Sequence, residues 1–168
     1  MSPDPDLTEV LAHAAPARAA QKFVTAVWRD RSMEEAWQLV ESPLRLFWAD
    51  LWLRACIADG LAPDLGTDEV IADLAANGPE HALWPVFAAS LLETFLGLPG
   101  DVHTWIPTDR QLVAGLDLVV VGMVPQPAEG IAVPEDSPML PMLMRYDLEA
   151  GWLVANAGGD QLPVVGVA

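Results

Sequence analysis

The stretch MLPMLMRYDLEAGWLVANA, residues 139–157, holds two runs of apolar, β-branched and aromatic residues separated by a short polar segment. Such runs are typical of strands, so residues 139–146 and 151–157 are predicted strands joined by a hairpin turn at residues 147–150. Residues 116–124, LDLVVVGMV, are the clearest further strand, with β-formers on both faces. The C-terminal part of the chain therefore predicts a mostly antiparallel sheet.

The closing hairpin can be aligned by pairing Tyr146 with Trp152 across the turn. Because side chains alternate along a strand, this register places one set on a shared face. The set is Tyr146, Trp152, Met144, Val154, Met142 and Asn156, with Met142 opposite Asn156. Arg145 falls on the other face, where a lone cation in an apolar strand needs a carboxylate partner. Asp117 on the neighbouring strand is one candidate.

Helical patterns precede the strands. Apolar residues at spacings of three and four predict helices over residues 16–29, 32–40, 43–57, 67–77 and 83–95. Ser32 and Glu35 form a capping box that opens the second helix, and Pro43 suits the first position of the third. The predicted buried stripe of the third helix is Leu44, Phe47, Trp48, Leu51, Trp52 and Ala55. Leu46 and Leu53 fall on the opposite side, so this helix is expected to be covered on more than one face. Pro85 predicts either a kink or the true start of the last helix.

The remaining segments complete a single-domain organisation, which 168 residues favour. Residues 101–106 and 110–114 are predicted short strands. Residues 125–138 hold four prolines and three acids and are a predicted Pro-rich loop, and residues 1–15 are expected to be loosely ordered. The predicted fold is one α+β domain, with N-terminal helices packed on one face of a bent, mostly antiparallel sheet.

Charge and hydropathy exclude several classes of protein. Eight Lys and Arg against 24 Asp and Glu give a net charge of −16, which disfavours nucleic acid and anionic membrane surfaces as partners. Hydrophobic residues make up 52% of the chain, too many for an intrinsically disordered protein. No run of about 20 uncharged apolar residues and no signal peptide is recognisable. We therefore expect a cytoplasmic protein, and the preference for Arg over Lys is typical of high-GC bacterial coding.

Two parts of the sequence, each made of two short stretches, carry a resemblance to a known family. They are AAQKFV, residues 19–24, with RDRSMEEAWQL, residues 29–39, and MLMRY, residues 142–146, with GWLVAN, residues 151–156. Together they resemble the nuclear transport factor two-like superfamily, cystatin-like α+β domains that include the SnoaL-like polyketide cyclases. The resemblance implies a cone-like domain in which an N-terminal helix pair crosses the concave face of a bent sheet. It also implies that any catalytic groups are scattered along the chain.

Seven Trp residues against one Tyr are an unusual proportion. These side chains are either plain core or the wall of a cavity for a flat apolar ligand. Met residues, which fill irregular space, fit either interpretation or a dimer face. The candidate pocket residues are Trp48, Trp52, Trp84, Trp105, Met142, Met144 and Asn156.

Candidate catalytic residues are few. Asp101 and His103 share one face of a predicted strand beside Trp105, and an adjacent carboxylate and imidazole can act as orienter and base. The three His residues show no metal-ligand spacing, and no phosphate-binding or dinucleotide motif is present, so neither a metal nor a cofactor is predicted. Cys56 is the one cysteine, which excludes an intramolecular disulfide.

These observations favour a non-catalytic binding or interaction module. We expect it to be a homodimer that pairs through the sheet face that the helices leave uncovered, because an apolar sheet face needs a cover in water. A small apolar ligand in a Trp-lined cavity is an additional hypothesis. The alternative is a SnoaL-like enzyme that uses His103 and Asp101 for isomerase, cyclase or hydratase chemistry on a small carbonyl compound. A third hypothesis is an acidic module that binds a basic partner protein.

Overall fold

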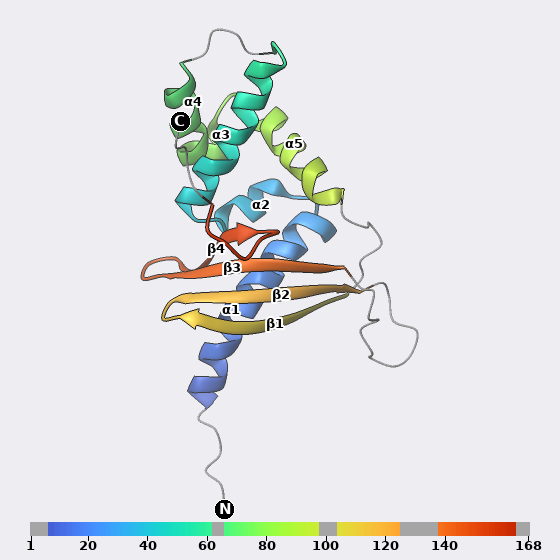
Figure 1. Ribbon diagram of the computed structural model, residues 1–168, viewed down its shortest axis with the longest axis vertical. Helices are drawn as coiled ribbons and strands as arrows, with labels where there is room; N and C mark the ends of the chain where they lie inside the picture. The colour runs from blue at the N-terminus through green and yellow to red at the C-terminus, as the bar shows by residue number, and fades with distance from the viewer. Residues whose placement is uncertain (1–6, 62–65, 98–103, 125–137, 164–168) are drawn as a thin grey trace, which may run out of the picture.

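Four antiparallel strands follow one another across the sheet in the order of the sequence (Figure 1). They are β1 (Thr104–Val113), β2 (Leu116–Val124), β3 (Met139–Asp147) and β4 (Gly151–Ala157). This computed structural model describes residues 7–61, 66–97, 104–124 and 138–163. The helices precede the sheet in the chain, so the predicted single α+β domain is confirmed. The predicted loop at residues 125–138 lies almost wholly outside the described residues.

The first strand differs from its prediction. Two short strands were expected at residues 101–106 and 110–114, but β1 is one strand that continues through Pro107. Proline cannot donate to a ladder, and it is tolerated here because β1 lies at an edge of the sheet and pairs with β2 alone among the described strands.

The closing hairpin follows the predicted register only near its turn. Tyr146 pairs with Trp152 and Met144 with Val154, as predicted. The expected pairing of Met142 with Asn156 is wrong, because the register shifts between Leu143 and Met144. A β-bulge places an extra residue in one strand, so Asn156 pairs with Leu143 and leaves the face on which Met144 lies.

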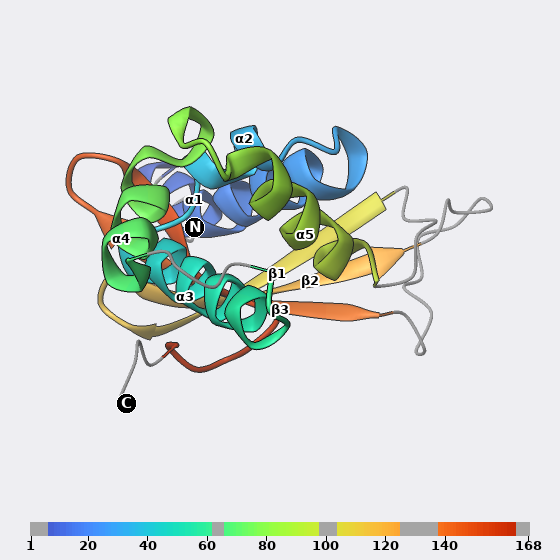
Figure 2. The same cartoon turned by 90° about the horizontal axis from the view of Figure 1, so that it is seen from above.

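Among the described residues, five α-helices and two short helical turns form the other layer. They are α1 (Leu7–Val24), the π-helical turn η1 (Thr25–Arg29), α2 (Met33–Gln38), α3 (Ser42–Ala58), α4 (Thr67–Asn77), the 3-10 turn η2 (Gly78–Glu80) and α5 (Trp84–Leu96). Residues 7–15, expected to be loosely ordered, belong to α1. This helix crosses one face of the sheet and contacts all four strands, whereas α2 to α5 lie beyond β4 (Figures 1 and 2).

Local signals place the helix starts. The Ser32 side chain accepts a hydrogen bond from the Glu35 N–H at 3.2 Å, as the capping box predicts. Proline lies in the first turn of both α3 and α5. The α5 helix therefore starts at Trp84, one residue before Pro85. The predicted stripe of α3 is wrong at Leu51, which is 60% exposed, whereas Leu53 on the opposite side is buried, as expected for a helix covered on more than one face. The α4 helix packs against α3 and so changes which side is covered.

The segment between α2 and α3 closes the free edge of β4. Val154 N–H donates to the Leu39 carbonyl at 2.7 Å, and Glu41 N–H donates to the Val154 carbonyl at 3.0 Å. Val40 thereby forms a parallel bridge with Val154. This short pairing ties the helical layer directly to the sheet and satisfies backbone groups that an edge strand otherwise exposes.

Candidate functional site

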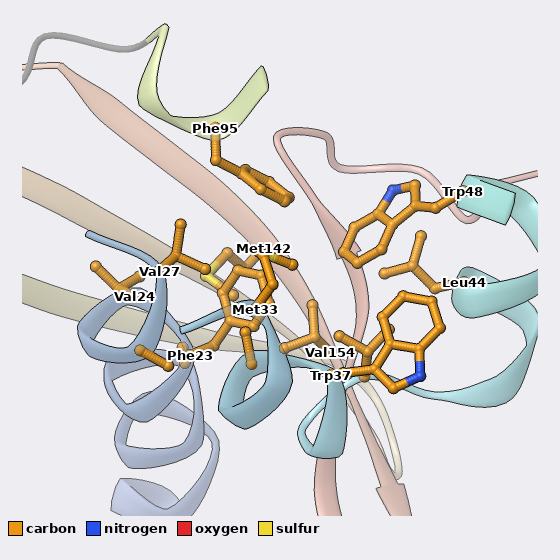
Figure 3. Close-up of a cluster of buried hydrophobic side chains, with 14 of the residues drawn as sticks. Phe23, Val24, Val27, Met33, Trp37, Leu44, Trp48, Phe95, Met142 and Val154 are labelled. Carbon is orange, nitrogen blue, oxygen red and sulfur yellow. The ribbon is translucent and has the colours of Figure 1, made fainter. Parts of the chain in front are cut away.

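Aromatic rings occupy the interior of the helical layer, close to β3 and β4 (Figure 3). Trp37, 1% exposed, lies at the centre. Its ring centroid is 6.4 Å from that of Trp48, 5.2 Å from that of Trp84 and 5.5 Å from that of Phe87. Trp48 in turn meets Phe95 at 5.5 Å, edge to face. Most of these contacts have the tilted or T-shaped geometry that aromatic pairs prefer, so the rings stabilise one another.

Several candidate pocket residues take part in this packing. Trp48 and Trp84 are each 8% exposed, and Met142 and Met144 are fully buried. Trp52 is half-buried, with its ring 5.2 Å from that of Phe87. The structure therefore brings these five residues into one apolar core. An apolar ligand at this place would have to displace one of the rings.

The other sequence-derived candidates do not join this group. The Asn156 side chain is half-buried, and its Nδ2 donates to the Gln161 carbonyl at 2.6 Å, so it holds the segment that follows β4. Trp105 lies in β1 opposite Met123, but its side chain is outside the described part of the chain. Asp101 and His103 also lie outside the described residues, so their pairing stays a prediction.

Arg145 finds a different partner from the one considered above. Its Nε lies 3.5 Å from Oε2 of Glu41, whereas Asp117 pairs with Met144 and so lies on the opposite face of the sheet. Glu41 is 7% exposed and Arg145 is half-buried. Burial raises the pKa of the Glu41 carboxyl, and the positive charge of Arg145 opposes that shift. The pair joins the start of α3 to the sheet across β4.

The two faces of the sheet differ in their cover. Val119, Val121, Met142 and Val154 are fully buried on the face toward the helices. The opposite face carries Leu118 paired with Leu143, Val120 paired with Pro141, and Leu153 paired with Arg145. We call this second surface the helix-free face, because both views show α1 on the other side of the strands (Figures 1 and 2).

The helix-free face is apolar but only partly open. Leu118, Val120 and Leu153 are half-buried, whereas Leu143 is 1% exposed. Leu143 pairs with Asn156, and paired residues share a face, so the Asn156–Gln161 hydrogen bond holds the following segment beside Leu143. In the described part of the chain, the centre of this face over β2 and β3 thus remains an apolar sheet surface without a helix on it.

The described residues also bear on metal binding and on membrane spanning. Among the described residues, no group of His, Cys, Asp or Glu is arranged to hold a metal ion. In the same part of the chain, no helix combines the length and the apolar character that crossing a bilayer requires.

Comparisons with protein-family models, with curated proteins and with solved structures gave no match for this chain. The resemblance to the nuclear transport factor two-like superfamily therefore stays a prediction. Any function must be argued from the geometry of the chain itself.

Sequence reasoning missed two residues that matter for this geometry. Glu41 precedes a helix-starting proline, and nothing local indicates that its carboxylate is buried. Arg45 lies in an apolar helix, where a lone cation between Leu44 and Leu46 could have been noticed as an unexplained charge. Both belong to the junction of α3 with the sheet.

Proposed function

We propose that the protein is a non-catalytic interaction module that pairs with a second copy of itself through the helix-free face. The supporting observation is that Leu118, Val120 and Pro141 form a contiguous apolar surface that no helix of the described residues covers. Antiparallel sheets commonly face water on one side, but they then alternate apolar and polar residues along each strand. The β2 run does not alternate in this way, which favours a cover from outside the chain.

The distribution of charge favours pairing of two copies through this face over pairing through other surfaces. Two copies of a chain with net charge −16 repel each other over most of their surfaces. Among the described strand residues, the charged side chains that the pairing places on the helix-free face are Arg110, Arg145 and, at the hairpin corner, Asp147. Arg145 is neutralised by Glu41, and Asp147 accepts hydrogen bonds from the turn. Pairing through this face therefore keeps most carboxylates of the two copies apart.

The described interior supports a binding role over the enzymatic alternative. An enzyme needs at least two polar groups that converge in a cavity. The two buried charged residues of the described part, Glu41 and Asp117, lie toward opposite faces of the sheet. The aromatic rings occupy the space between the helices and the sheet. The SnoaL-like hypothesis rests on Asp101 and His103 alone.

Analytical ultracentrifugation of two matched variants tests the proposal. Val120→Lys places a charge at the centre of the helix-free face and is expected to convert a dimer into a monomer at micromolar concentration. Leu148→Lys adds the same charge at the hairpin tip, where Leu148 is 92% exposed, and is expected to leave the dimer unchanged. A monomeric wild-type protein, or equal behaviour of the two variants, would refute pairing through this face.

A further inference from the structure

The helices α3 and α4 lie side by side beyond the sheet (Figure 2). Residues of both helices line a groove. Its volume is about 450 Å³, within the range of small-molecule sites. The residues that line it are Ser42, Arg45, Leu46, Ala72, Ala75 and Ala76. Alanines form the α4 wall, so the helix backbone lies close to the groove and leaves room for a ligand. Arg45 is the one charged side chain in this lining.

The Arg45 guanidinium is held in place from two sides. Its Nε donates to the Val40 carbonyl at 2.9 Å, and its central carbon lies 5.4 Å from the centroid of the Trp37 ring. A guanidinium over an indole face gains a cation–π attraction, and the backbone hydrogen bond restricts its rotation. Less conformational freedom is then lost when a ligand binds.

Within the part of the chain that the structure describes, no ion pair neutralises the positive charge of Arg45. No carboxylate of the described residues lies within ion-pair distance of Arg45. The carboxylate one helical turn earlier, Glu41, pairs with Arg145 instead. Arg45 is half-buried, and this burial lowers its pKa. Acidic residues outnumber basic residues three to one in this chain. A partly buried cation without an ion-pair partner is therefore unexpected.

The Trp37 ring that the guanidinium lies over has an unpaired hydrogen-bond donor. The Trp37 side chain is 1% exposed, and its indole Nε1–H has no hydrogen-bond acceptor among the described residues. Figure 3 shows the nitrogen edge of this ring directed away from Phe23 and Met142. That edge lies toward Gly78, outside the groove lining. The lining itself offers the Arg45 guanidinium and no carboxylate, which is a composition that an anion completes.

We propose that this groove binds a small monocarboxylate with a short apolar body. The carboxylate accepts hydrogen bonds from the Arg45 guanidinium, whose planar fork matches its two oxygens. The apolar body lies against Leu46 and the alanine wall of α4. One cation and apolar walls select a single negative charge over a polyanion. The site does not depend on the helix-free face, so it can exist whether or not the chain forms a dimer.

Isothermal titration calorimetry with octanoate as the probe tests this site. Wild-type protein is expected to bind octanoate saturably and octanamide, which has the same body without the charge, at least tenfold more weakly. Arg45→Gln is expected to lose at least tenfold in octanoate affinity. Arg54→Gln is the matched control, because Arg54 lies on the same helix, is exposed and pairs with Asp50, and it should bind as wild type.

A second variant separates binding from folding. Ala76→Leu fills the groove from an exposed position on α4 without touching the charge, and it is expected to weaken octanoate binding while the circular dichroism spectrum stays unchanged. Equal octanoate affinity in Arg45→Gln and Arg54→Gln would overturn the proposal. Equal affinity of wild type for octanoate and octanamide, or no saturable octanoate binding, would also overturn it.

Discussion

Gly78 is the position at which one added methyl group has the most clearly calculable effect. It follows α4 with φ +46° and ψ −110°, a region that residues with a Cβ rarely adopt. A Cβ on Gly78 would lie 2.5 Å from Nε1 and 2.7 Å from Cδ1 of Trp37. Trp37 cannot move aside easily, because its ring contacts Trp48, Trp84 and Phe87. Gly78→Ala therefore combines backbone strain with overpacking.

Both contributions can be estimated. Backbone strain of this kind costs about 1–3 kcal/mol, and overpacking a well-filled core costs about 1–3 kcal/mol. We expect Gly78→Ala to lower the free energy of unfolding by about 2–6 kcal/mol in total. Urea unfolding followed by far-ultraviolet circular dichroism measures this loss without relying on tryptophan fluorescence.

A control and a double-mutant cycle identify the cause. Gly151→Ala shares the positive φ, +80°, but its Cβ would have nothing within 4 Å, so it should cost only the strain. Trp37→Val removes the whole ring, and with it the Nε1 and Cδ1 atoms that the new Cβ meets. The Gly78→Ala loss should then shrink by about 1–3 kcal/mol in the Trp37→Val background. The reasoning is refuted if the loss is the same in both backgrounds, or if it equals that of Gly151→Ala.

Two further predictions concern Glu41, where α3 meets the sheet, and His81, which lies between η2 and α5. Because burial raises the pKa of Glu41, its contribution to stability is present below the ordinary value of 4.5 and is lost as pH rises through the raised value. Glu41→Gln should therefore gain stability relative to wild type between about pH 4.5 and neutrality, and a pH-independent difference in urea midpoints would contradict this. The His81 Nδ1 accepts the Leu83 N–H at 3.0 Å, so His81→Ala should cost about 1–2 kcal/mol. His81→Asn, which keeps an acceptor there, should recover most of that loss in the same urea titration, and equal losses would argue against the hydrogen bond.

The parts of the fold that were predictable depend on short-range chemistry. The Ser32 cap, the proline in the first turn of α3 and the hairpin turn each involve residues within a few positions of one another. In the turn, the Asp147 carboxylate accepts the N–H groups of Glu149 and Ala150 at 2.8 Å, and Gly151 adopts a positive φ. Such signals are visible in the sequence because the interacting groups are neighbours in the chain.

The parts that were not predictable depend on long-range packing. The bulge that moves Asn156 to the other face has no local signature. Leu51 is exposed although it belongs to the predicted stripe of α3, because the helical pattern alone does not indicate where the neighbouring helix α4 packs. Glu41 reaches Arg145 only once the α2–α3 segment has paired with β4. For the candidate sites, the sequence indicated the uncovered sheet face but not the α3–α4 groove.

The distribution of aromatic residues explains why both proposed sites lie at the surface. Five of the seven Trp residues lie on helical segments, and their rings pack on one another and on Phe87 and Phe95. Because each ring serves as the wall for the next, the helical layer is stable without a ligand at its centre. Specificity must then come from groups at its boundary, and Glu41 and Arg45 lie there, at the α2–α3 segment and just after it. At that segment Glu41 neutralises Arg145 toward the sheet, which leaves Arg45 as the cation that faces outward, into the groove.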